Sequence, residues 1–110
     1  MIKNYLKIFG CFFVLFSTSI YADGNYNLGK EKSQTCVACH GIDGNSDNKL
    51  YPRLAGQYQN YLIYSLRSYK NGTRKNAIMN GFAATLSDKD IKDISKYFSE
   101  QKGLKVLPSN

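Results

Sequence analysis

One five-residue motif constrains this chain more than any other feature: Cys36-Val37-Ala38-Cys39-His40. Two cysteines three positions apart, with a histidine directly after the second, form the C-x-x-C-H signature of covalent c-type haem attachment. One short turn can present both sulfurs to the two vinyl groups of a single haem, while the adjacent imidazole reaches the iron. The motif therefore predicts one haem c, with Cys36 and Cys39 as thioether anchors and His40 as the proximal iron ligand.

Two other interpretations of a C-x-x-C pair fit this sequence less well. A thiol–disulfide redox centre usually lies beside a βαβ pattern, and the sequence shows no such pattern. A zinc site normally takes four Cys, His or carboxylate ligands. The only cysteine outside the motif is Cys11, which lies in a segment that we expect to be removed. The haem interpretation is therefore preferred.

The first 22 residues have the three-part pattern of a secretory signal peptide. Residues 1–7 are basic, 8–16 form an almost unbroken apolar run, and 17–22 are rich in small residues. The apolar run is shorter than the roughly 20 residues of a membrane-spanning helix, so cleavage after Ala22 is preferred over a retained anchor. We expect export to the periplasm, since covalent haem attachment in bacteria occurs outside the cytoplasmic membrane, and one mature domain of residues 23–110.

Short helical stretches separated by turn residues make up the mature chain. Residues 27–35 are typical of a solvated helix that leads into the motif, and 41–48 are typical of a loop. Residues 57–69 form the clearest helix, with tyrosines and leucines at three- and four-residue spacing on one face, and Asn71-Gly72 ends it. We interpret the tyrosine stripe as core packing rather than as a redox path.

The last helix has the clearest start signal in the chain. Ser87 is a natural N-cap, and Asp90 stands where a capping box places its acidic partner. Apolar positions continue at helical spacing to Phe98, and Gly103 closes the helix. Because no alternating strand pattern is present, we expect an all-α fold of three to four helices packed around one covalently bound haem. A mature chain of 88 residues needs such support for its small core.

The haem iron needs either a second protein ligand or an open position opposite His40. No other histidine exists in the chain, so one chain cannot supply two histidine ligands. Met79 is the only methionine left after removal of the signal peptide, and it lies between the two clearest helices. A lone methionine is more often core filler, but the haem motif favours Met79 as the distal iron ligand. Because histidine–methionine ligation raises the potential of an electron-transfer haem, the predicted function is to carry one electron.

Together these features resemble a class I cytochrome c. The closest type is the short single-haem bacterial periplasmic cytochrome, which also occurs as one half of the di-haem periplasmic cytochromes c. The similarity runs from about Leu28 to about Gly103 and includes the segment YPRLAGQ at residues 51–57. The resemblance implies an all-α fold with the haem edge exposed at one side. It also implies that Gly29 lets the first and last helices cross closely near Tyr97.

The resemblance further implies roles for four residues beyond the motif and Met79. Pro52, twelve residues after His40, would accept a hydrogen bond at its carbonyl from the proximal imidazole and so orient the ring. Arg53 and Leu54 would lie against the haem. Arg74 is a candidate partner of a haem propionate, with a solvated loop arginine as the alternative interpretation.

We expect a soluble electron carrier, not an enzyme, that shuttles electrons between a membrane quinol-oxidising complex and a terminal oxidase or peroxidase. The net charge is +7, or +5 without Lys3 and Lys7. Five basic residues flank the segments expected to ring the haem: Lys49, Arg53, Lys70, Arg74 and Lys75. Such a surface could steer docking onto an acidic partner or hold the protein at an anionic membrane surface. No basic run resembles a nucleic-acid-binding motif, so nucleic acid is not an expected partner.

Two other function classes compete with the electron carrier. A haem-based gas sensor or ligand-binding protein would have weak or absent Met79 ligation and a sixth site open to a gas. Carbon monoxide binding by the reduced protein at neutral pH would favour this alternative. A small haem enzyme such as a peroxidase would need a distal histidine for acid–base catalysis, and the sequence offers none.

Overall fold

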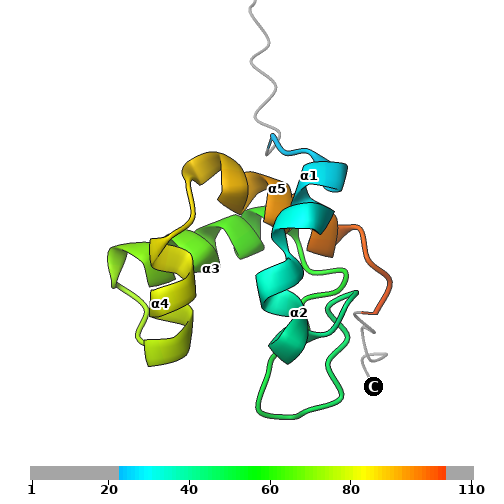
Figure 1. Ribbon diagram of the computed structural model, residues 1–110, viewed down its shortest axis with the longest axis horizontal. Coiled ribbons are helices and arrows are strands. Elements are labelled where there is room, and N and C mark those ends of the chain that lie inside the picture. The colour runs from blue at the N-terminus through cyan, green and yellow to red at the C-terminus, as the bar shows by residue number, and fades with distance from the viewer. Residues whose placement is uncertain (1–22, 104–110) are drawn as a thin grey trace, which may run out of the picture.

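The structure is a computed structural model that describes residues 23–103. The predicted signal peptide, Cys11 included, lies outside the described residues, as do residues 104–110. The described part of the chain is all-α, as predicted, and none of its helices is long and apolar enough to cross a membrane. It contains five helices, shown in Figure 1: α1 (Tyr26–Lys32), α2 (Gln34–His40), α3 (Gln59–Asn71), α4 (Ala77–Ala84) and α5 (Asp88–Ser99).

The described residues form five helices where three to four were expected, for two local reasons. The first predicted helix is divided at Ser33, whose backbone N–H bonds to the carbonyl of Gly29 and whose hydroxyl bonds to the carbonyl of Lys30. The C-x-x-C-H motif after this break is itself helical and forms most of α2. The second reason is α4, which begins where the Asn76 side chain accepts a hydrogen bond from the backbone N–H of Met79. This helix is too short and too uniformly apolar to show a helical period.

Gly29 marks the point where α1 crosses α5. It is buried, and a Cβ atom at this position would collide with the backbone carbonyl of Asp93 and approach the Cβ of Tyr97 to 3.0 Å. The Tyr97 ring packs at a tilt against Tyr26, with 5.2 Å between ring centroids, and its hydroxyl donates a 2.7 Å hydrogen bond to the carbonyl of Ile42. The close crossing expected near Tyr97 is therefore confirmed.

The buried apolar cluster lies between α3 and α5. Leu62 of α3 packs there with three residues of α5: Ile94, Tyr97 and Phe98. Four partly buried side chains pack against this cluster: Cys36, Leu54, Leu66 and Leu86. The cluster is small, as expected for a chain of this length, and it receives a side chain directly from the motif helix α2.

Asp93 is a buried carboxylate that joins α5 to the beginning of the described chain. Its side chain is 1 % exposed and accepts hydrogen bonds from Lys32 Nζ (2.8 Å), Lys89 Nζ (2.9 Å) and the backbone N–H of Asn25 (2.8 Å). Burial by itself raises the pKa of this carboxyl. The three hydrogen bonds outweigh it and lower the pKa to about 2. The ionised form is thus the one that the fold stabilises.

The lowered pKa of Asp93 predicts that the stability of the fold falls in acid. Because its folded-state pKa lies below the ordinary value of 3.8, the ionised carboxylate contributes stability above about pH 4, and the contribution is lost as the pH falls toward 2. It amounts to about 2 kcal/mol. Urea unfolding at several pH values should show Asp93→Asn less stable than wild type at pH 7, with the gap narrowing below pH 4. Asp47→Asn is the control, since the Asp47 side chain is fully exposed. An equal gap at pH 7 and pH 3 would contradict the linkage.

Candidate haem-binding site

His40 is the last residue of α2, and its ring is held in a defined orientation. The residue is 7 % exposed, and its Nδ1 lies 2.8 Å from the carbonyl oxygen of Pro52. A carbonyl oxygen only accepts hydrogen bonds, so the hydrogen is assigned to Nδ1, which donates the hydrogen bond to Pro52. The Nε2 lone pair is then the one that can coordinate a metal. The helix stops immediately afterwards at Gly41, whose φ of 87° favours glycine.

Cys36 and Cys39 lie three positions apart on α2, a spacing that puts them on adjacent parts of one helix surface. Both side chains are partly buried, and they are not joined in a disulfide. Burial raises the pKa of the Cys36 thiol, which keeps it protonated. A thiol–disulfide redox centre instead needs a cysteine whose pKa is lowered, so the local environment of Cys36 does not favour redox-thiol chemistry.

In the described part of the chain, His40 has no neighbouring side chains that would complete a metal site with it. Within residues 23–103, no three His, Cys, Asp or Glu side chains lie close enough together to hold a metal ion. A lone, oriented imidazole would suit an iron whose remaining ligands come mostly from a macrocycle. The donor set therefore fits haem iron and does not fit zinc.

The surroundings of α2 also fit a large flat group. In the described chain α2 packs against α1, and its backbone comes close to none of the helices α3, α4 and α5. Figure 1 shows α2 and α4 standing apart, with α3 passing above both. Among residues 23–103, nine large apolar side chains are at least a third exposed: Tyr26, Leu28, Ile42, Leu50, Tyr58, Tyr61, Tyr64, Ile78 and Phe82. A covalently attached porphyrin would cover part of this apolar surface and enlarge the core.

Met79 lies in the first turn of α4 and is partly buried. The Asn76 side chain caps its backbone N–H, and the Asn80 side chain donates to the carbonyls of Tyr69 (2.7 Å) and Arg74 (2.8 Å). These bonds tie α4 to the end of α3. Among the described helices the backbone of α4 approaches that of α3 and not that of α2, so His40 and Met79 come from helices whose backbones are not adjacent.

The structure brings Leu54 to the buried cluster, whereas Arg53 and Arg74 lie elsewhere. The backbone N–H of Leu54 donates to the carbonyl of Gly44 (2.8 Å). Arg53 is exposed and donates from Nε to the carbonyl of Ser46. Arg74 donates to the hydroxyl of Ser65 (3.2 Å), and its guanidinium lies 4.8 Å from the centroid of the Tyr69 ring. Arg74 therefore rests on α3.

Gly44 is a residue of this region that sequence reasoning missed. Its φ is 81°, and a Cβ atom there would approach the backbone N of Ala55 to 2.8 Å and the Phe98 ring to 2.9 Å. Its carbonyl accepts the N–H groups of both Leu54 and Ala55. Gly44 thus fixes the segment that carries Pro52 and Leu54. In the sequence, its position in a loop dense in Gly, Asn and Asp does not distinguish it from its neighbours.

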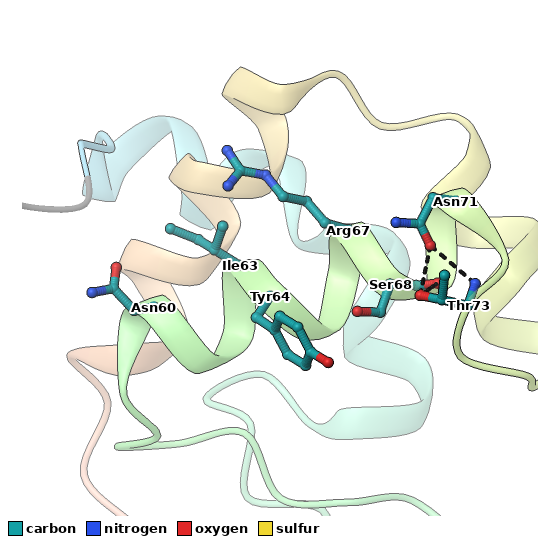
Figure 2. A pocket seen from close by; sticks show the side chains of 7 residues that line it. All are labelled: Asn60, Ile63, Tyr64, Arg67, Ser68, Asn71 and Thr73. Atoms are coloured by element: carbon teal, nitrogen blue, oxygen red, sulfur yellow. Dashed lines mark hydrogen bonds between the residues drawn. The ribbon is translucent and has the colours of Figure 1, made fainter.

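A separate pocket of about 610 Å³ lies along one side of α3. Figure 2 shows Asn60 at one end and the hydrogen-bonded pair Asn71 and Thr73 at the other. Arg67, which also lines the pocket, is paired with Asp88 at 2.6 Å. None of the predicted site residues lines it, so this pocket is distinct from the motif region.

Comparison of the sequence with models of protein families gives a match over nearly all of the described chain. The family model "Cytochrome c" matches residues 26–102. The chain belongs to the cytochrome c family. This confirms the resemblance predicted from the motifs, and with it covalently bound haem c as the cofactor of this family member.

The relatives that this chain resembles are bacterial cytochromes c. The chain is 43 % identical over 82 residues to cytochrome c4 of Pseudomonas aeruginosa, which covers 74 % of this chain and 41 % of that protein. It is 45 % identical over 82 residues to cytochrome c-554(548) of Halomonas halodenitrificans, covering 72 % of this chain and 99 % of the relative. The crystal structure of reduced recombinant cytochrome c4 from Pseudomonas stutzeri superimposes with a TM-score of 0.71 at 42 % identity, over 74 % of this chain and 48 % of that one. The chain thus spans about half the length of the cytochrome c4 relatives or less.

Proposed function

We propose that this chain is an exported single-haem electron carrier of the periplasm. The observation that carries the proposal is the C-x-x-C-H helix α2, which ends in a buried histidine with Nδ1 bonded to the carbonyl of Pro52 and Nε2 available to iron. Haem iron alternates between ferrous and ferric states and so holds or releases one electron. An electron carrier needs a haem that is firmly anchored and a ligand set that changes little between these states.

In this proposal, the chain's own residues hold the haem on both faces. Cys36 and Cys39 bond to its vinyl groups, and His40 ligates the iron from α2. Met79 would supply the second protein ligand, supported by the Asn76 cap that fixes the first turn of α4. Histidine–methionine ligation raises the potential into the range of respiratory carriers and leaves no open position for substrate chemistry. The protein is accordingly not an enzyme.

Four further residues have supporting roles in the proposal. The Pro52 carbonyl keeps the proton on Nδ1 of His40 and so sets how strongly the imidazole donates to iron. Leu54 packs beside the haem from the buried cluster. Arg53 and Arg74 supply positive charge near the haem propionates. Arg74 donates a hydrogen bond to the hydroxyl of Ser65, so its positive charge lies beside the middle of α3.

The proposed place of the chain is between membrane-bound redox complexes. Residues 1–22 act as a cleaved signal peptide, and residues 23–110 work in the periplasm, free or peripheral to the membrane. A quinol-oxidising complex supplies the electron, and a terminal oxidase or peroxidase accepts it. The basic residues Lys49, Lys70 and Lys75 contribute to docking, so electron transfer to the partner should slow as salt is added.

The experiment that tests this function is the visible spectrum of the purified exported protein, oxidised and reduced, followed by exposure to carbon monoxide. We expect a c-type reduced spectrum, the weak oxidised band near ~700 nm that reports methionine–iron ligation, and no carbon monoxide binding at neutral pH. Ready carbon monoxide binding without that band would replace the carrier with a haem-based gas sensor. Cys36→Ser with Cys39→Ser is the matched control and should lose covalent haem.

A further inference from the structure

The side chain of Asn80 makes three hydrogen bonds across the connection between α3 and α4. Its Nδ2 donates to the carbonyl of Tyr69 (2.7 Å), in the last turn of α3, and to the carbonyl of Arg74 (2.8 Å). Its Oδ1 accepts from the backbone N–H of Asn76 (2.8 Å), the N-cap of α4. An asparagine amide offers two N–H donors and one acceptor oxygen, so the bonding capacity of this side chain is well used.

Asn76 and Asn80 together fix the backbone at Met79. The Asn76 side chain accepts from the backbone N–H of Met79 (3.0 Å), and the Asn76 backbone N–H donates to the Asn80 side chain. This is the arrangement of a capping box with the returning side chain one position later than usual. One contact is made at the N–H of Met79 and the other at the residue that follows it. The backbone of Met79 is therefore held from both sides.

An amide at position 80 is unfavourable for the helix itself. Asparagine is a poor helix former, because its side chain competes for backbone hydrogen bonds. Asn80 is the only polar side chain of α4, whose sequence is AIMNGFAA, and the glycine that follows it weakens the helix further. A helix of eight residues is not stable by itself, so α4 depends on its contacts with α3. The hydrogen bonds of Asn80 are the polar part of those contacts.

Other side-chain hydrogen bonds near this connection do not hold α4 in the same way. The Asn71 side chain accepts from the backbone N–H and the hydroxyl of Thr73, within the turn that follows α3 (Figure 2). Lys70 bonds to the carbonyl of Leu86, which lies beyond the end of α4. Because α4 has no second polar side chain, only Asn80 links it by a side-chain donor to the residues before it.

We propose that Asn80 is the positioning residue for Met79, and that its three hydrogen bonds hold α4 where the thioether can ligate the haem iron. The inference rests on the proposed function, in which Met79 is the distal ligand. A thioether is a soft and neutral donor, whereas ferric iron is a hard ion, so their bond is weak and depends on how firmly the protein holds the sulfur. Loss of a residue that orients a metal ligand typically weakens the binding by roughly 10- to 100-fold.

The test is competition between Met79 and imidazole at the oxidised iron at neutral pH, followed by loss of the band near ~700 nm. Asn80→Ala removes all three hydrogen bonds, so imidazole should displace Met79 at about tenfold lower concentration than in wild type. Asn80→Asp should have at least this effect, because a carboxylate cannot donate to the two carbonyls. Asn80→Gln keeps the amide on a longer side chain and should shift the midpoint only about threefold.

A double-mutant cycle measures whether Asn80 acts through Met79. Adding Asn80→Ala to Met79→Ala should leave the imidazole affinity within ~2-fold of the Met79→Ala single variant, since the ligand that Asn80 positions is already gone. A further change of about tenfold in the double variant would mean that Asn80 controls imidazole access directly. That result would overturn the positioning of Met79.

Asn71→Ala is the matched control that separates positioning from stability. It removes two hydrogen bonds from the turn that follows α3, and neither of them reaches α4. Urea unfolding should show Asn71→Ala and Asn80→Ala both less stable than wild type. Only Asn80→Ala should shift the imidazole midpoint, whereas Asn71→Ala should stay within ~2-fold of wild type. Equal shifts in the two variants, or a wild-type midpoint in Asn80→Ala, would overturn the proposal.

A second substitution at position 81 covers the case in which α4 itself becomes unstable. Gly81→Ala adds a methyl group that meets open space and strengthens the helix. When it is combined with Asn80→Ala, the helix is strengthened but the three hydrogen bonds are not restored, so the shift of about tenfold should persist. A return to the wild-type imidazole midpoint would show that helix stability holds Met79, and would overturn the role of Asn80.

The wild-type spectrum tests the carrier function separately from this inference. A band near ~700 nm in wild type, together with an unshifted imidazole midpoint in Asn80→Ala, would overturn only the positioning role. Absence of the band in wild type, with carbon monoxide binding after reduction, would overturn ligation by Met79 and the electron-carrier function together.

Discussion

Met79→Ala should turn the protein from a closed electron carrier into one that binds external ligands. The cysteines would still hold the haem, but the iron would lose its distal thioether. We expect loss of the oxidised band near ~700 nm, carbon monoxide binding after reduction, and a potential lowered by on the order of 0.1 V, because methionine ligation is what raises it. Visible spectroscopy and redox titration measure all three effects.

A second substitution at the same position is the control. Met79→His should again lack the band near ~700 nm and have a lowered potential, yet it should not bind carbon monoxide, since histidine fills the position. Wild-type spectra in both variants would contradict ligation by Met79. Carbon monoxide binding by wild type itself would favour the gas-sensor alternative.

Gly29→Ala should be the most destabilising single methyl addition in the described fold. The new Cβ collides with the backbone carbonyl of Asp93 and crowds Tyr97, so α1 and α5 must move apart. Overpacking of this kind costs about 3 kcal/mol where backbone atoms are the obstacle. For a domain of this size, that lowers the melting temperature by on the order of 15 °C. Thermal unfolding followed by circular dichroism measures the shift.

Gly81→Ala is the matched control for this stability prediction. Gly81 is also a helical glycine, but its added methyl group meets open space. It should raise the free energy of unfolding by up to ~1 kcal/mol through helix propensity alone. Equal destabilisation by the two substitutions would show that the α1–α5 crossing is not the cause.

Local signals in the sequence predicted those parts of the fold that depend on neighbouring residues. The capping box of α5 is confirmed, since Ser87 and Asp90 bond reciprocally as its spacing predicted. The helix predicted at 57–69 is observed as α3, two residues later at each end. Its end at Asn71-Gly72 follows from the left-handed conformation of Gly72, which a sequence pattern can indicate.

Features that depend on long-range packing could not be predicted in this way. In the sequence, Asp93 is one of three aspartates in the first turns of the last helix, where the helix dipole favours negative charge. Its burial follows from the approach of Lys32 and Asn25, which no local pattern records. The haem motif predicted His40 by itself, whereas the position of Pro52 relative to it came from family resemblance. Met79 as the distal ligand stays a prediction.

The pairing of α1 with α5 has a consequence for the order in which the chain can fold. The contacts of Asp93 with Lys32 and Asn25 span 61 and 68 positions of sequence, so they close a loop that holds most of the domain. Closing such a loop is slow relative to forming any single helix. Until that loop closes, the chain's own packing cannot enclose the motif helix. In the proposed exported protein, the interval before α1 and α5 pair is therefore the one in which the two cysteines are accessible for haem attachment.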